Sequence, residues 1–110
     1  MPDQTSPGTF IPMDAVLRKL GLPPSMSTDL DVVAARDAAE AFVRRHHPGR
    51  TEWPADYVLG AVKLAAGLHR DAATPGIAEP FAQANVYKRA TDVEIEQLLQ
   101  IGRFSTPVVG

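Results

Sequence analysis

The sequence has 110 residues, of which 45% are apolar and 22% are charged, and its formal net charge is −2. This length fits one domain with a modest core, and the charge balance excludes a strong, non-specific electrostatic clamp on nucleic acid. The absence of cysteine excludes disulfides, a thiolate nucleophile and cysteine-ligated zinc. No apolar run reaches the roughly 20 residues that span a bilayer, and the N-terminus lacks the pattern of a signal peptide. We therefore expect a soluble, intracellular product.

The N-terminal part of the chain predicts an arm followed by a short helix. Residues 1–12 are mostly polar and rich in proline, which is typical of an arm ordered only by its contacts. A helix is expected over residues 13–20, because Pro12 suits a helix entrance and Gly21 suits a helix exit.

A second helix is expected over residues 29–46. Ser27 or Thr28 is suited to cap it, and Asp29 favours its positive end. At about 100° per residue, one face gathers five apolar side chains: Leu30, Ala34, Ala38, Ala41 and Phe42. Three charged residues fall on the opposite side at a spacing that favours ion pairs: Arg36, Glu40 and Arg44.

The third helix, expected over residues 54–73, has the strongest pattern in the chain. Its wide apolar face consists of Tyr57, Val58, Ala61, Val62, Leu64, Ala65 and Leu68. The other side combines charged residues with two glycines: Asp56, Gly60, Lys63, Gly67 and Arg70. A solvent-facing glycine inside a helix costs roughly 1 kcal/mol relative to alanine. The two glycines therefore indicate close approach of another backbone, from a neighbouring helix or a second subunit.

The last third of the chain predicts a long connection and a final helix. Residues 74–90 are expected to form a loop, with some strand character over residues 85–89. Thr91 and Glu94 have the spacing of a capping box, and the helix that follows has an apolar stripe and ends at Gly102. The stripe consists of Ile95, Leu98 and Leu99. Together these elements predict an all-α fold: a small bundle of about four helices over residues 13–102, with a long loop, an N-terminal arm (1–12) and a C-terminal tail (103–110).

The residues that could carry catalysis do not form a recognisable site. His46 and His47 are adjacent, so on a helix they point about 100° apart and do not share a metal as histidines at i, i+4 do. His69 lies at the edge of an apolar face, where a satisfied, partly buried histidine is the simpler interpretation. No phosphate-binding glycine loop or nucleophile elbow is present. The sequence therefore predicts no catalytic, cofactor-binding or metal-binding residues.

One basic cluster stands out, formed by Arg44, Arg45, His46, His47 and Arg50. The simpler interpretation is a solvated helix end that complements the helix dipole. The alternative is contact with a phosphate backbone or an acidic protein surface. Trp53 and Tyr57 are interpreted as core anchors rather than as stacking platforms for bases.

Two segments resemble the head-to-tail connector (adaptor) proteins of long-tailed bacteriophages. One is the helical stretch YVLGAVKLAAGLHRDAATPG, residues 57–76, and the other is the terminal stretch VYKRATDVEIEQLLQIGRFSTPVVG. The resemblance runs from about Asp29 to the end and does not include the N-terminal third. The residues that match the terminal pattern of the family are Asp92, Val93, Leu98, Leu99, Gly102, Arg103, Phe104, Pro107 and Gly110.

The resemblance implies a structural virion protein without enzymatic activity or cofactors. In that family a small helical protein forms a homo-oligomeric ring, typically of twelve copies, beneath the portal vertex in the neck of the virion. The C-terminal segment reaches the portal protein, the far side receives a head-closure, stopper or tail protein, and DNA passes through the lumen without sequence-specific binding. The protein is made in the host cytoplasm and needs no membrane. The implied portal contacts are Arg103, Phe104, Pro107, Val108 and Val109, and the implied subunit contacts are Asp56, Gly60, Lys63, Gly67 and Arg70.

Three other classes of protein remain as alternatives. A head-closure or tail-terminator neck protein is expected to be rich in β-strands, which this sequence is not. A helical DNA-binding regulator needs basic and amide side chains at the entrance of a recognition helix, whereas the third helix opens with Pro54, Ala55 and Asp56. A small metal-dependent hydrolase predicts bound metal in the purified protein.

Overall fold

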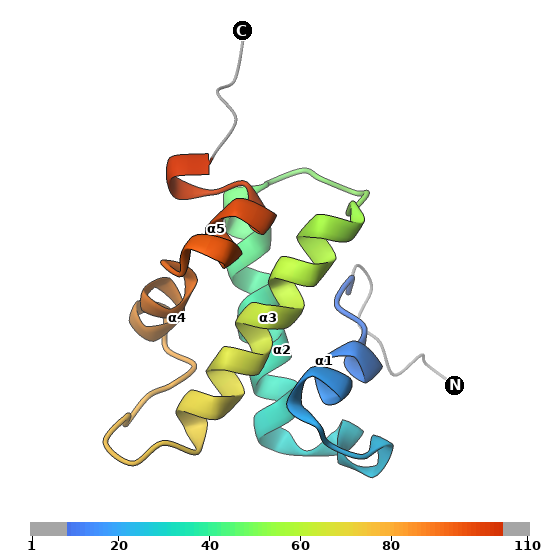
Figure 1. The fold of residues 1–110 in the computed structure, drawn as a ribbon, viewed down its shortest axis with the longest axis vertical. Coiled ribbons are helices and arrows are strands. Elements are labelled where there is room, and N and C mark those ends of the chain that lie inside the picture. Colours follow the sequence, from blue (N-terminus) through green and yellow to red (C-terminus); the bar gives the residue numbers. More distant parts are fainter. Residues whose placement is uncertain (1–8, 105–110) are drawn as a thin grey trace, which may run out of the picture.

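Helix α3 (Ala55–Ala72) runs through the middle of the fold, and the four other α-helices all pack against it. In the computed structural model, shown in Figure 1, residues 9–104 are described, without the side chain of Arg103. These residues form five α-helices, two short 3-10 helices and no strand. The all-α prediction is confirmed, and one helix more is present than expected.

The bounds of the first helix are confirmed. Helix α1 (Met13–Leu20) begins after Pro12 and ends at Gly21, whose φ of 73° is a left-handed conformation that glycine adopts without strain. The 3-10 helix η1 (Pro24–Thr28) follows. Because Ser27 and Thr28 belong to this turn, the prediction that one of them caps the second helix was wrong.

Helix α2 (Leu30–His46) is capped by Asp29, whose carboxylate accepts hydrogen bonds from the amides of Asp31 and Val32. The predicted apolar face was wrong at two positions, since Leu30 is 83% exposed and Ala41 is exposed. The buried residues are Val32, Ala35, Ala39, Phe42 and Val43. Alanines lie on both sides of this helix, so its hydrophobic periodicity does not single out one face.

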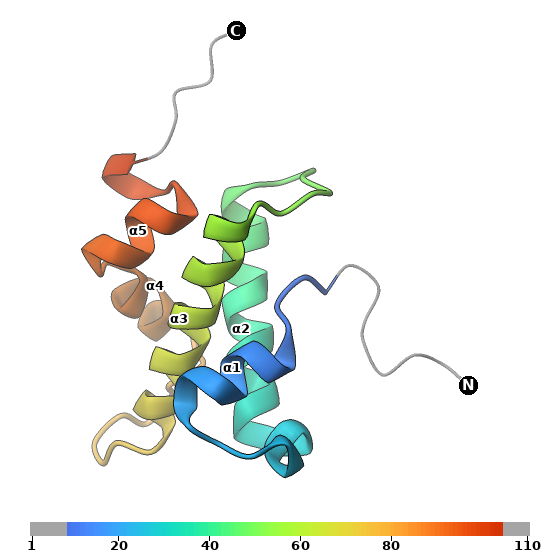
Figure 2. The same ribbon diagram turned by 45° about the vertical axis from the view of Figure 1, so that its right-hand side comes forward.

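Helix α3 buries the apolar face predicted from its spacing, including Ala61, Leu64 and Leu68, which are all fully buried. It also buries Gly60, Ala66 and Gly67 on its other side. Helices cover α3 from both flanks (Figures 1 and 2), so the close approach that the two glycines indicated comes from helices of the same chain.

The segment expected to be a loop with strand character contains helix α4 (Gln83–Ala90), which buries Val86 and Ala90. Helix α5 (Val93–Leu99) follows and is capped by Asp92, which accepts from the amides of Glu94 and Ile95. The predicted capping box was wrong, because Thr91 is the C-terminal cap of α4.

The end of α5 also differs from the prediction. The helix ends at Leu99, its C-terminal cap Gln100 has a φ of 55°, and the amide of Ile101 then donates to the carbonyl of Glu96. Ile101 is buried, and the 3-10 helix η2 (Gly102–Phe104) completes the described chain. Helix α5 therefore ends before the predicted position, Gly102, and a 3-10 helix occupies residues 102–104.

The core also contains residues from the predicted N-terminal arm. Ile11 is fully buried, and Phe10 stacks on Trp53 with 4.0 Å between ring centroids. Figure 2 shows α1 on one side of α3 and the α4–α5 pair on the other, with α2 behind. Among the described residues, no helix combines the length and apolarity that crossing a membrane requires.

Candidate functional site

The two adjacent histidines are both used to hold helix ends. His46 lies with Nδ1 3.0 Å from the carbonyl of Phe42, and His47 lies with Nε2 2.7 Å from the carbonyl of Leu99. Because a carbonyl only accepts, each of these ring nitrogens is the protonated donor. Residues 9–104 contain no group of three histidine or carboxylate side chains able to hold a metal ion. The contact from His47 ties the end of α2 to the end of α5.

Two arginines of the basic cluster contact aromatic rings, and one of them also pairs with a carboxylate. Arg44 bonds to Glu40 at 3.1 Å and lies over the stacked rings of Phe10 and Trp53. Arg50 lies over Tyr57, 4.7 Å from the ring centroid. Cation–π contacts of this kind stabilise exposed sites by about 0.5–1 kcal/mol each. Arg44 and Arg50 therefore have a structural role at the 47–54 connection, where Trp53 is partly buried.

The glycines of α3 are explained by helices of the same chain. A methyl group in place of the Gly60 hydrogen would lie 2.9 Å from Cβ of Leu98 and from side-chain atoms of Leu99. At Gly67 the corresponding distance to Cδ of Arg89 is 2.8 Å. Of the two explanations open from the sequence, the neighbouring helix accounts for both positions. Neither glycine requires a second subunit.

The three charged residues of the same stripe, Asp56, Lys63 and Arg70, do not share a contact partner. Asp56 is exposed, and its carboxylate accepts from the amide of Tyr57. Lys63 pairs with Glu94 of α5 at 3.3 Å. Arg70 is exposed at the edge of a second pocket described below. Their contact with another subunit stays a prediction.

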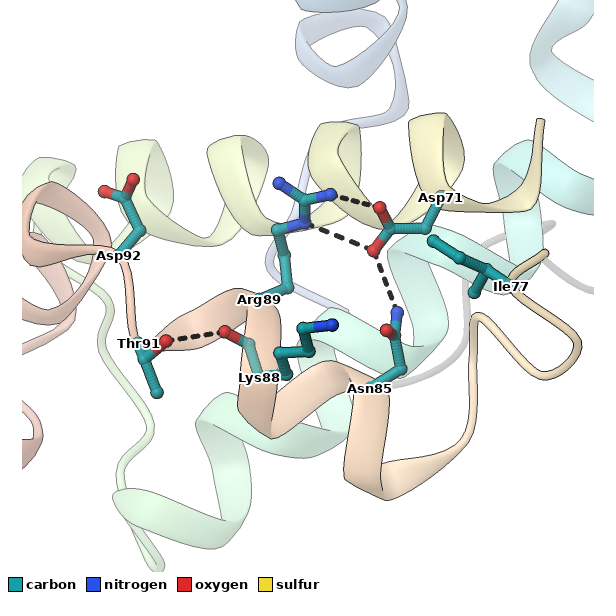
Figure 3. A pocket seen from close by; sticks show the side chains of 7 residues that line it. All are labelled: Asp71, Ile77, Asn85, Lys88, Arg89, Thr91 and Asp92. Atoms are coloured by element: carbon teal, nitrogen blue, oxygen red, sulfur yellow. Dashed lines mark hydrogen bonds and ion pairs between the residues drawn. The ribbon is translucent and has the colours of Figure 1, made fainter. Parts of the chain in front are cut away.

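Asp71, near the end of α3, is the one buried charged residue among those described. Its carboxylate accepts from the side-chain amide of Asn85 at 2.8 Å and from Nε of Arg89 at 3.2 Å. It also pairs with Nη2 of Arg89. Figure 3 shows the guanidinium of Arg89 and the amide of Asn85 converging on this carboxylate from α4.

Hydrogen bonding decides the ionisation of this group. Burial by itself raises the pKa of Asp71, but the hydrogen bonds from Arg89 and Asn85 outweigh it, and the pKa lies below its ordinary value of 3.8. The hydrogen bond to Asp71 likewise raises the pKa of Arg89. The carboxylate therefore stays ionised at neutral pH.

A pocket of about 300 Å³ adjoins this ion pair (Figure 3). Its lining residues are Asp71, Ile77, Asn85, Lys88, Arg89, Thr91 and Asp92. Because Asp71 already accepts from two side chains and Asp92 caps α5, neither carboxylate is placed as a general base. The arrangement fixes α4 against α3.

Sequence reasoning missed the group formed by Asp71, Asn85 and Arg89. One signal was present: Asp71 follows Leu64 and Leu68 at helical spacing and therefore lies on a face that is otherwise apolar. A charged residue at such a position needs a partner, because an unpaired buried charge is costly. The partner helix itself was not predicted.

Most of the residues expected to contact the portal protein lie outside the described part of the chain. Pro107, Val108 and Val109 fall beyond residue 104, and the side chain of Arg103 is not described. Phe104 is half-buried in η2. Just before it, Leu99 and Ile101 are buried in the core, so the chain is anchored up to the point where these residues begin.

No protein-family model, curated protein or solved structure matches this chain.

Proposed function

We propose that this chain is a head-to-tail adaptor of a long-tailed bacteriophage, which forms a ring under the portal vertex, joins the capsid to the tail and passes DNA. The observation that carries the proposal is the terminal pattern from Asp92 to Gly110, with the small-residue helix over residues 57–76. In this proposal the protein is structural and has no catalytic role.

The described end of the chain supports this assignment. Asp92 caps α5, and Leu98 and Leu99 pack against Gly60. The first half of the terminal pattern therefore holds α5 on the bundle. Figure 1 shows the 3-10 helix η2, in red after α5, at the same end of the bundle as the 47–54 connection. In this proposal residues 103–110 contact the portal protein, and the chain just before them is anchored in the core by Leu99 and Ile101.

The competing classes have less support. Head-closure and tail-terminator proteins are expected to be β-rich, and residues 9–104 contain no strand. A DNA-binding regulator is expected to present a basic recognition helix. Arg44, near the end of α2, instead lies over aromatic rings and pairs with Glu40, and Arg50 just beyond the helix lies over Tyr57. The net charge of the chain is −2.

The proposal assigns contacts between neighbouring copies to a groove between α1 and α3. This groove has a volume of about 480 Å³ and is lined by Ala15, Arg18, Lys19, Ala55, Val58, Leu59 and Val62. Leu59 is 47% exposed there, and exposed apolar patches of this kind favour protein contacts. A ring needs such an unpaired surface on every copy. Gly60 and Gly67 are not available for it, because α4 and α5 cover them.

Co-purification with the portal protein of the same virus tests the assignment. We expect the full chain to bind the portal protein and a chain ending at Phe104 to lose most of that binding. The truncation keeps Ile101, which is part of the core, so the shortened chain should melt as cooperatively as the full chain. Failure of the full chain to bind the portal protein would overturn the proposal. Equal binding by both chains would exclude residues 105–110 from the portal contact and assign it to the part of the chain up to Phe104.

The subunit contact has its own test. Leu59→Lys should reduce ring formation while leaving the melting of the monomer unchanged, because Leu59 is already half-exposed. Leu30→Lys is the matched control, since Leu30 is 83% exposed and lies outside the groove. Analytical ultracentrifugation of both variants with and without the portal protein would show the difference. If both variants form rings equally well, the groove is excluded as the contact between neighbouring copies.

A further inference from the structure

A second pocket, of about 270 Å³, collects positively charged side chains from three helices. Lys19 comes from α1, Lys63 and Arg70 from α3, and Arg89 from α4. The remaining lining residues are Gly67, Asp92, Glu94 and Ile95. Residues distant in the sequence thus bring four cations to one concave surface.

Two of these four cations are neutralised within the chain and two are not. Lys63 pairs with Glu94, and Arg89 pairs with Asp71. Within residues 9–104, neither Lys19 nor Arg70 forms an ion pair with a carboxylate. The carboxylate of Asp92 is engaged by the amides of Glu94 and Ile95. The pocket therefore has an excess of positive charge.

The proximity of Lys19 and Lys63 is electrostatically unfavourable, because both side chains are cations. The pKa of Lys19 is lowered, first because the Lys63 ammonium can donate a hydrogen bond only to the neutral amine of Lys19, and then because the Lys63 charge repels a second positive charge. The charge of Arg70 lowers this pKa further, and the charge of Glu94 opposes these effects. An anion between the cations would relieve this repulsion.

Gly67 contributes to the geometry of the pocket. Because it has no side chain, Arg89 crosses α3 at this position, with Cδ 2.8 Å from where a Cβ would lie. The Asp71 carboxylate then fixes the guanidinium through two of its nitrogens. Arg89 is thus held at the boundary between the two pockets, since it lines both.

We propose that this pocket is a binding site for a phosphate oxyanion, either free phosphate or the phosphate group of a DNA backbone. Lysine and arginine donors on different helices suit an anion with several oxygens, which accepts from more than one of them at once. A single carboxylate has two oxygens and satisfies fewer of these donors. The proposal goes beyond the adaptor function, and its test needs neither the portal protein nor ring assembly.

Titration of the isolated full chain with inorganic phosphate tests the site by calorimetry, with chloride at matched ionic strength as the reference. Removing one charged donor should cost about tenfold in affinity, so Lys19→Gln and Arg70→Gln should each weaken binding by about that factor. Arg45→Gln is the matched control, because it removes the same charge from an exposed position outside the pocket. Its affinity for phosphate should stay within about twofold of the unchanged chain.

The second arm replaces inorganic phosphate with a short DNA duplex at several salt concentrations. Binding that falls in Lys19→Gln and Arg70→Gln but not in Arg45→Gln supports the pocket, and the arm in which it occurs identifies the source of the phosphate. Equal binding by all four proteins in both arms would overturn the proposal. Absence of binding to both phosphate and duplex by the unchanged chain would overturn it as well.

A spectroscopic readout complements the affinity. Nuclear magnetic resonance of the lysine side chains should show the pKa of Lys19 rising when phosphate is added, because a bound anion favours the charged ammonium. The same titration with Arg70→Gln should show a smaller rise. A pKa of Lys19 that does not respond to saturating phosphate would contradict the site.

Discussion

Two sides of helix α3 are buried by different means. The apolar face, which includes Ala61, Leu64 and Leu68, is packed in the hydrophobic core. The glycine stripe, formed by Gly60 and Gly67, is covered by Leu98, Leu99 and Arg89. The first side is stabilised by burial of large alkyl groups. The second relies on small residues that let side chains of α4 and α5 approach, and on the ion pair of Asp71 beside it.

This difference shows why one side was predictable and the other was not. Large apolar residues at helical spacing indicate burial whatever covers them. A glycine indicates only that something is close, and its partner can belong to the same chain or to another. The partner became identifiable only when α4 and α5 were placed.

The largest effect is expected on the apolar face. Leu68→Ala should lower the free energy of unfolding by about 3 kcal/mol, because it removes a fully buried side chain and leaves a cavity. Urea denaturation followed by circular dichroism measures it. Leu30→Ala is the control and should change stability by about 0.5 kcal/mol or less, since Leu30 is 83% exposed. Similar losses in both variants would contradict the assignment of the core.

The ion pair beside the glycine stripe should contribute less. Asp71→Asn should cost about 2 kcal/mol at neutral pH, because it weakens the bonds to Arg89 and Asn85 in a buried position, while Arg89 itself is partly exposed. The same denaturation experiment measures this cost.

The loss should also depend on pH with a definite sign. Since folding lowers the pKa of Asp71, its stabilisation is present above the ordinary value of 3.8 and is lost as pH falls through the lowered pKa. The unchanged chain and Asp71→Asn should therefore converge in stability in strongly acidic solution. A constant difference between them across this range would show that the charge of Asp71 does not stabilise the fold.

The two glycines should respond differently to alanine. Either substitution gains about 1 kcal/mol in helix propensity. At Gly60 the new methyl would meet Cβ of Leu98, which is fixed to its backbone, so a net loss of about 1–2 kcal/mol is expected. At Gly67 it would meet Cδ of Arg89, which can shift by rotation of its own side chain while the guanidinium keeps its bonds to Asp71, so the net change should be about 1 kcal/mol or less. Thermal melts that rank the two variants in the opposite order would contradict the packing of α5 on α3.

The smallest effect is expected at a surface ion pair far from this comparison. Arg18 and Asp14 lie 3.0 Å apart on α1, with side chains that are 74% and 72% exposed. Arg18→Gln should change the free energy of unfolding by about 0.5 kcal/mol or less, because solvent and salt screen such pairs. Denaturation at low and high salt would check it, and a loss comparable to that of Asp71→Asn would refute this ranking.

Prediction from sequence succeeded where local chemistry is unambiguous. The bounds of α1 follow from Pro12 and Gly21, and the apolar face of α3 follows from its spacing. Prediction failed in the last third of the chain, where the missed helix α4 led to a second error at Thr91. Helix α4 has only two buried residues, Val86 and Ala90, so its periodicity is weak. Without α4, Thr91 could not be identified as the end of one helix and was taken as the start of the next.

The N-terminal arm shows the same limit. Phe10 and Ile11 lie in a segment with proline and glycine nearby and no periodic pattern. Their burial depends on Trp53 and the core behind it, which no local signal indicates. The pocket of Lys19, Lys63, Arg70 and Arg89 was equally hidden, because its members come from three helices. Only Lys63 and Arg70 were noted, as part of one helix stripe.

Electron microscopy of the portal protein mixed with the full chain tests the central claim, the adaptor function, most directly. The account predicts additional density forming a ring of this chain beneath the portal, with the cyclic symmetry expected of a closed homo-oligomer. Portal particles that show no added ring at a large excess of the chain would contradict it.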